Sequence, residues 1–263
     1  MDIQINSKVF VAFLTKCRVG GLIKDLILNA SAGNIWARVA PSDASFYGEV
    51  YEPNVKIIAE GNIKIPSIDK ILAVLSRTST EVIKIASADG VFAITDGNAQ
   101  GKMKTKLFEL GDAEFVESFQ RIKDKPDLFN KEKLEYVSGK YKYENGIEVS
   151  YEMLQTLLKD AKAFGFELYR FEDVKIKDQN IVACIIEDIA TKERFQRNLE
   201  VVSKIGNSFQ KITVGAGFRE MVSSLDKEQG DKGKISVKLY FSPSTILITN
   251  NSTYFFNLHA VVD

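Results

Sequence analysis

Two halves of the sequence share one order of predicted secondary structure, and this repeat restricts the fold more than any other feature. Each half starts with a short apolar strand, at residues 3–5 and 147–149, that leads directly into an amphipathic helix. Several strands, a second short helix and a closing three-stranded meander follow in each half. A repeat of this length indicates a duplicated domain rather than a solenoid unit. Chance similarity within a single α+β protein is the alternative, and the matching meanders favour duplication.

Four short segments have the spacing of amphipathic helices. The first spans residues 7–18, and the second begins after Ser67, a good N-cap, and reaches residue 77. The third begins after Ser150 and the fourth after Gly217. Their apolar stripes, which should face the core, are Val9, Phe10, Phe13, Leu14 and Cys17 in the first, Ile68, Ile71, Leu72 and Leu75 in the second, Met153, Leu154, Leu157, Ala161 and Phe164 in the third, and Phe218, Met221, Val222 and Leu225 in the fourth.

Most of the remaining chain predicts β-strands, which are clearest in the closing meanders at residues 82–107 and 235–262. The predicted fold class is therefore α+β, with two similar domains of antiparallel sheets and two short helices in each. We place the domains at residues 1–110 and 134–263, joined by a charged connector at 111–133. The connector contains scattered phenylalanines. It is either a solvated linker or a strap whose aromatic side chains dock on the sheets.

Composition excludes several classes of protein. The 263 residues carry 35 basic and 35 acidic side chains, so a uniformly basic nucleic-acid binder is excluded. The single histidine, His259, removes histidine metal sites and makes a Ser-His or Cys-His relay improbable. We find no P-loop, HExxH, GxSxG or GxGxxG motif. We therefore expect no enzyme, no metal and no cofactor, although an enzyme that uses carboxylate or lysine chemistry stays open.

The N-terminus and the cysteines bear on the compartment. No apolar run approaches the roughly 20 residues that span a bilayer, and the N-terminus lacks the layout of a signal peptide. Cys17 and Cys184 lie far apart in the sequence, which fits buried thiols in a reducing compartment. We expect an intracellular, soluble protein of the cytoplasm or nucleus without a membrane partner.

The four helical segments carry most of the interpretable charge. They hold nine basic and five acidic residues, an excess of four positive charges in a neutral chain. Lys70 with Arg77 and Arg219 with Lys227 are expected at equivalent places on equivalent helices. Such a surface would bind phosphates without reading bases. The nine basic residues are Lys8, Lys16, Arg18, Lys70, Arg77, Lys159, Lys162, Arg219 and Lys227.

This layout resembles the sliding-clamp family of DNA polymerase processivity factors, most closely the two-domain clamps of the proliferating-cell-nuclear-antigen type and of T4-like phages. The resemblance covers nearly the whole chain. It is carried by residues 7–51, by VKIIAEGNIKIPSIDKILAVLSR at 55–77, by VIKIASADGVFAITDG at 82–97, by residues 146–165 and by the C-terminal segment 234–263. The neutral net charge and the long, charged connector depart from the usual family pattern.

The resemblance implies a homotrimeric ring that encircles duplex DNA, with the nine basic residues facing the DNA. The implied partners are a DNA polymerase, a clamp-loader ATPase and other proteins that bind the clamp through short peptides. The positions that match the peptide groove are Val39, Ala40, Ala44, Tyr47, Phe115, Phe119, Leu128, Phe129, Pro243, Leu258, Ala260 and Val261. Two alternatives stay open: a monomeric or dimeric processivity factor that forms no ring, and a β-rich protein-interaction module without a DNA function.

Overall fold

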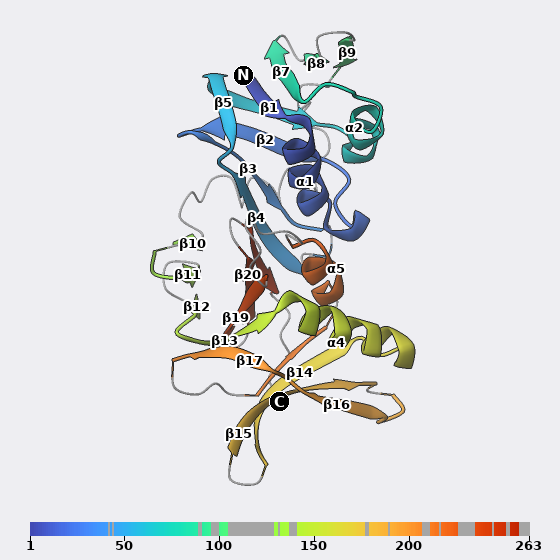
Figure 1. Cartoon of the computed structure of the whole chain (residues 1–263), viewed down its shortest axis with the longest axis vertical. Coiled ribbons are helices and arrows are strands. Elements are labelled where there is room, and N and C mark those ends of the chain that lie inside the picture. The colour runs from blue at the N-terminus through green and yellow to red at the C-terminus, as the bar shows by residue number, and fades with distance from the viewer. Residues whose placement is uncertain are drawn as a thin grey trace. The chain divides into compact units, whose positions relative to one another are not determined.

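The structure is a computed structural model of the whole chain, shown in Figure 1. It divides into two compact units, one of Met1–Ser42 with Gly48–Arg121 and one of Asp43–Tyr47 with Ile122–Asp263. A short segment from the first half of the sequence, residues 43–47, is thus grouped with the second unit. The residues that the structure describes are 1–41, 43, 45–88, 91–95, 100–104, 129–130, 132–136, 141–176, 179–188, 190–206, 211–215, 217–225, 235–243, 245–250 and 253–257.

In its described residues the first unit combines two antiparallel strand arrays with two α-helices. One array has the order β5-β1-β7-β8-β9, and in the other β3 pairs with β4 and β2, and β2 pairs with β6. Helices α1 and α2 pack side by side (Figure 1). In chain order the elements are β1 (Asp2–Asn6), α1 (Ser7–Arg18), the 3-10 turn η1 (Val19–Gly21), β2 (Leu26–Ser31), β3 (Asn34–Val39), β4 (Phe46–Glu52), β5 (Val55–Ala59), β6 (Gly61–Ile65), α2 (Ile68–Leu75), β7 (Val82–Ala88), β8 (Val91–Thr95) and β9 (Gln100–Lys104).

The second unit repeats this arrangement after a small three-stranded sheet. Its arrays have the orders β17-β13-β19-β20-β21 and β16-β15-β14-β18, and α4 packs against α5. In chain order the elements are β10 (Phe129–Asn130), β11 (Glu135–Tyr136), β12 (Tyr141–Lys142), β13 (Asn145–Ser150), α4 (Tyr151–Phe164), β14 (Leu168–Ile176), β15 (Gln179–Glu187), β16 (Arg194–Asn198), β17 (Val201–Ile205), β18 (Ile212–Val214), α5 (Phe218–Ser223), β19 (Ser236–Ser242), β20 (Thr245–Asn250) and β21 (Thr253–Asn257).

Strand pairing confirms the two similar domains. In the first unit β1 lies between β5 and β7, and in the second its counterpart β13 lies between β17 and β19. Both units also have an irregular register where β1 meets β5, at Asp2/Ile3, and where β13 meets β17, at Glu148/Val149. Residues 105–128 lie outside the described part, so the predicted connector and domain boundaries stay predictions. The one strand of the described residues that falls within 111–133 is β10, and it pairs with β11 at 135–136.

The helices begin where their capping residues predict. Asn6 caps α1 by accepting a hydrogen bond from the Lys8 amide at 2.9 Å, and Ser67 and Ser150 cap α2 and α4 in the same way. α5 begins after Gly217, which has a positive φ of 85° and offers no side-chain cap. A Cβ atom at Gly217 would lie 2.9 Å from Cδ1 of Phe46, so this position needs glycine for space as well as for conformation.

Aromatic residues from the predicted stripes form the centre of each core. In the first unit Phe10 and Phe13 are fully buried and their rings stack at 6.2 Å. In the second unit the Phe218 ring lies 4.7 Å from that of Tyr169. The prediction that Phe164 is buried is wrong, because this residue is 51% exposed. It is the last residue of α4, and its ring stacks on Phe195 of the outer strand β16 at 5.0 Å.

Candidate nucleic-acid interface

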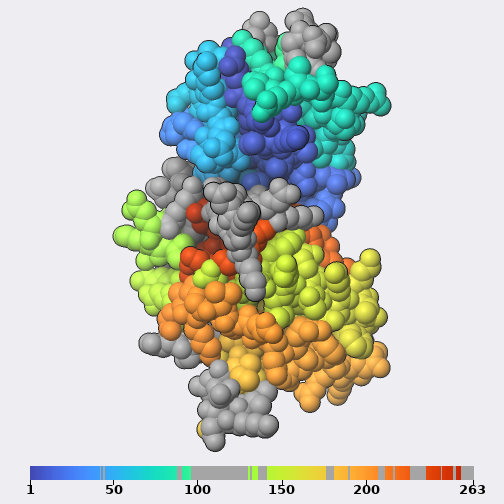
Figure 2. Space-filling model, viewed as in Figure 1, coloured from blue at the N-terminus to red at the C-terminus, as the bar shows by residue number. Residues whose placement is uncertain are grey.

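Both helix pairs present basic side chains to solvent. Lys8 on α1 and Lys70 on α2 are exposed, as are Lys159 and Lys162 on α4. Arg77 is also exposed but lies just beyond the end of α2. In Figure 2, α1 in dark blue and α2 in teal form part of the visible surface of the first unit, and α4 in yellow-green forms part of that of the second. Lys227 lies outside the described residues.

Lys16 departs from the predicted basic face. It is only 6% exposed, and helical periodicity places it three residues after Phe13, at the margin of the apolar stripe of α1 rather than opposite that stripe. Lys16 lies in the last turn of the helix, where its carbonyl accepts the amide of Val19 and the chain turns back through η1. Periodicity does not account for this turn. We therefore leave Lys16 out of the proposed DNA-contacting set.

An ion pair between the two helices of the first unit involves Arg18. Its Nε lies 2.7 Å from Oδ1 of Asp69 on α2, and the two side chains are 39% and 61% exposed. The Arg18 guanidinium also lies against Gly21 of η1, where a Cβ atom would be 3.5 Å away. The pair neutralises one of the predicted basic residues. Sequence periodicity could not identify it, because it depends on which helices become neighbours.

Arg219, the basic residue of α5, interacts with a tyrosine hydroxyl, whereas Arg18 pairs with the carboxylate of Asp69. Arg219 is half-buried, and the hydroxyl of Tyr169 on β14 raises the pKa of its guanidinium. Burial raises the pKa of Tyr169 itself. With the capping positions Ser67 and Gly217 aligned, Arg219 is the counterpart of Asp69. The expected equivalence of Arg219 with Lys70 is therefore wrong, because it ignored the position of the caps.

A tyrosine cluster in the second unit includes one residue of the predicted partner groove. Tyr47 is buried and packs with Tyr143, Tyr240 and Leu247. The Tyr143 hydroxyl shares a 2.9 Å hydrogen bond with that of Thr245, and burial raises the pKa of Tyr240. Four partly exposed residues surround this tyrosine cluster and give it an apolar, aromatic surface: Leu134, Tyr141, Ile205 and Tyr254. Sequence reasoning missed all of these except Tyr47, because they come from segments that are far apart in the chain.

The other predicted groove residues are only partly described. Val39 is buried in β3, Ala40 beside it is half-buried, and Pro243 is exposed between β19 and β20. Phe129 begins β10, and its side chain is not among those described. The remaining predicted groove residues lie outside the described part of the chain: Ala44, Phe115, Phe119, Leu128, Leu258, Ala260 and Val261.

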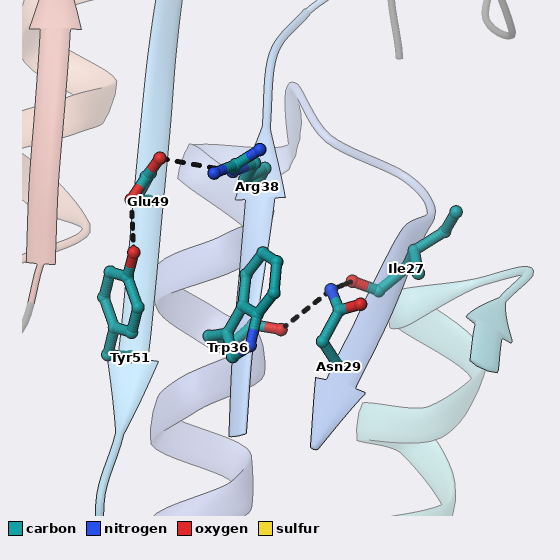
Figure 3. A network of polar contacts seen from close by, with 6 residues as sticks. All are labelled: Ile27, Asn29, Trp36, Arg38, Glu49 and Tyr51. Atoms are coloured by element: carbon teal, nitrogen blue, oxygen red, sulfur yellow. Dashed lines mark hydrogen bonds and ion pairs between the residues drawn. The ribbon is translucent and has the colours of Figure 1, made fainter. Parts of the chain in front are cut away.

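A polar network crosses β2, β3 and β4 of the first unit (Figure 3). Arg38 Nε lies 3.2 Å from Oε1 of Glu49, and the Tyr51 hydroxyl donates a hydrogen bond to the other carboxylate oxygen. The Arg38 guanidinium also lies over the Trp36 ring, 5.3 Å from its centre. The side chain of Asn29 on β2 completes the network by donating to the Trp36 carbonyl. Because Glu49 is 2% exposed, we assign this network a structural role. In the sequence it is indicated by Trp36 and Arg38, which are two residues apart on one strand and therefore share a face.

The described residues contain no group of three or more His, Cys, Asp or Glu side chains that could hold a metal ion. Within the same residues, no helix is long and apolar enough to cross a membrane.

Comparison with known proteins yields a match of fold. No protein-family model and no curated protein sequence matches the chain. Among solved structures, PCNA of A. fulgidus, bound there to the C-terminal region of FEN-1, has a TM-score of 0.67 and 10% identity, over 100% of this chain and 98% of that one. A chain of the PCNA2–PCNA3 complex of Sulfolobus tokodaii has a TM-score of 0.65 and 9% identity, over 100% of this chain and 100% of that one.

A bacterial clamp gives a similar score over part of its length. The DnaN sliding clamp of Bartonella birtlesii, bound to griselimycin, has a TM-score of 0.65 and 14% identity over 99% of this chain. This chain spans 65% of that protein. The duplicated strand order, the two pairs of helices in the described residues and these matches agree: the chain has the fold of the DNA sliding clamps.

Proposed function

We propose that this protein is a DNA sliding clamp, a ring subunit that encircles duplex DNA and tethers a DNA polymerase and other DNA-processing proteins. The observation that carries the proposal is the duplicated unit, together with a fold that matches solved clamps over the whole chain. In this function the protein catalyses no reaction. It gives processivity because a closed ring stays on DNA through topology while its contacts with phosphates remain weak.

The internal repeat supports ring closure. By strand order β4 is the counterpart of β16, and β21 is the counterpart of β9. Within the second unit, Phe46 at the start of β4 packs against Phe255 on β21, with ring centres 6.3 Å apart. Strands β9 and β16 are outer strands of their sheets in the described chain. The equivalent contact is thus available between β9 of one copy and β16 of the next, which repeats head to tail and can close a ring.

The surface beside β16 fits this role. The half-exposed Phe164 ring stacks on Phe195, and Arg197 lies over the same ring and pairs with Asp160 of α4. An open sheet edge beside exposed aromatic rings is a surface that proteins normally cover. A trimer, with six similar domains, is the closed assembly that we propose, with a mass of about 88 kDa from a chain of 29.4 kDa.

The basic residues predicted for the helices, apart from the buried Lys16, are the proposed contacts with DNA. Because contacts to phosphates carry no sequence information, the proposed contact is independent of sequence and sensitive to salt. The tyrosine cluster and Pro243 are the proposed floor of the groove for partner peptides, since partly exposed tyrosines are typical anchors of protein interfaces. The proposed DNA contacts are Lys8, Arg18, Lys70, Arg77, Lys159, Lys162, Arg219 and Lys227.

A loader-free threading assay tests the topology. A linear duplex is fixed to a bead at one end, incubated with micromolar protein, and then closed at its free end with a bulky protein before a wash at high salt. A ring threaded over the free end survives the wash and is released when a nuclease cuts the DNA. A duplex closed at both ends beforehand should retain nothing.

Binding before and after the wash separates the alternatives. A monomeric or dimeric factor would bind both substrates equally before the wash and would be removed from both at high salt. A protein-interaction module would bind neither substrate, even before the wash. Light scattering on a sizing column complements the assay, because a mass near 29.4 kDa at micromolar concentration would contradict the trimer.

A further inference from the structure

We infer that Asp69 competes with DNA phosphates for Arg18 and thereby weakens the contact of the first unit with DNA. This inference rests on the proposed clamp function. The ion pair joins α1 to α2 at 2.7 Å, and both side chains are accessible, Asp69 more than Arg18. A phosphate that approaches Arg18 therefore meets a carboxylate on the same surface.

The repeat shows that this acid is particular to one unit. Arg18 and Lys162 both lie twelve positions after the capping residue of their helix, Asn6 for α1 and Ser150 for α4. Asp69 and Arg219 both lie two positions after theirs. A cation and an anion in the first unit thus correspond to two cations, Lys162 and Arg219, in the second.

The two helix pairs also differ in how carboxylates lie around their basic residues. Glu167 and Glu220 act on Arg219 electrostatically, but no carboxylate of the described residues forms an ion pair with Lys162. In the first unit the carboxylate of Asp69 directly faces the arginine. The two units should therefore attract the DNA backbone unequally.

The strength of the pair suits a sliding contact. An exposed ion pair is weak, so Arg18 can exchange between Asp69 and a passing phosphate. Each cation that reaches a phosphate releases counterions and steepens the salt dependence of binding. Asp69 would reduce this release, and the ring would slide with less friction than its count of basic residues suggests.

Four proteins test the inference: the wild type, Asp69→Asn, Arg18→Gln and the double variant. Their dissociation constants for a random-sequence duplex are measured by fluorescence anisotropy from 50 to 200 mM salt. Asp69→Asn should bind more tightly, and its log–log salt slope should be steeper by about 0.9 for each Arg18 that reaches a phosphate. Arg18→Gln alone should bind less tightly than the wild type, because it removes a proposed contact and leaves Asp69 unpaired, and adding Asp69→Asn to Arg18→Gln should give no gain beyond that of the charge control described below. A gain that persists without Arg18, or no gain in Asp69→Asn, would overturn the inference.

A matched control separates this effect from net charge. Asp173→Asn frees Lys204 from an exposed ion pair of 2.9 Å between β14 and β17, and it changes the charge by the same amount. Equal gains from Asp69→Asn and Asp173→Asn would refute the role of Asp69. Urea unfolding of each variant checks the fold, and Asp69→Ser provides a second neutral variant if Asp69→Asn is unstable.

The failures of the two proposals are distinguishable. A wild-type protein that does not thread onto DNA refutes the clamp function, whereas threading with no change in Asp69→Asn refutes only this inference.

Discussion

Replacing Arg38 by methionine should destabilise the first unit strongly. Glu49 is 2% and Arg38 10% exposed, and their charged atoms lie 3.2 Å apart. Without Arg38 the carboxylate stays buried beside the Tyr51 hydroxyl but loses its cation, which costs about 3–5 kcal/mol. Loss of the guanidinium from the Trp36 ring adds roughly 0.5–1 kcal/mol. We therefore expect the free energy of unfolding to fall by about 3–6 kcal/mol.

Urea unfolding followed by tryptophan fluorescence measures this change directly, because Trp36 is the single tryptophan and lies within the network. The matched control is Arg38→Met combined with Glu49→Gln. It removes the stranded charge and leaves an amide oxygen that can accept from Tyr51, so most of the lost stability should return. A loss below about 1 kcal/mol in the single variant, or a double variant less stable than the single one, would show that the pair does not behave as a buried ion pair.

Three further changes address the assembly, the DNA contact and the tyrosine cluster. Reversing Lys70 and Arg77 to glutamate should reduce retention in the threading assay at moderate salt without altering the unfolding curve; unchanged retention would remove both from the DNA contact. Phe164→Glu should lower the solution mass from about 88 to about 29 kDa, whereas Val202→Glu, at an exposed site on β17, should not; equal masses for the two variants would exclude Phe164 from the interface. Tyr143→Phe should cost about 1–3 kcal/mol in urea unfolding, because the buried hydroxyl of Thr245 loses its partner. Unchanged stability would mean that another group satisfies Thr245.

Local sequence signals predicted the elements of this fold well. The capping residues Ser67 and Ser150 located the starts of α2 and α4, and the glycine at 217 located α5. The duplication was visible because each unit repeats its strand–helix start and its closing meander. These signals are short in range, so they survive without knowledge of the tertiary structure.

Side-chain environments that depend on distant neighbours were not predictable in this way. The burial of Lys16 depends on how the chain continues after α1. The exposure of Phe164, the last residue of α4, depends on its position beside the outer strand β16. The ion pair of Arg18 with Asp69 requires α1 and α2 to be adjacent. The tyrosine cluster likewise assembles from segments that are far apart in the sequence. Periodicity names none of its members as a site, and Tyr47 is predicted only through the resemblance to the clamp family.

The position of Phe46 has a consequence for the synthesis of the chain. Its ring rests on Phe255 and fills the space that a side chain at position 217 would need. At about 5–20 residues per second, Phe255 leaves the ribosome roughly 10–40 s after Phe46. During that interval the start of β4 has no native neighbour on β21. Phe46, which belongs to the second unit, therefore lacks its aromatic partner until β21 has been synthesised, and a gene fragment that ends before β21 encodes Phe46 without the ring on which it packs.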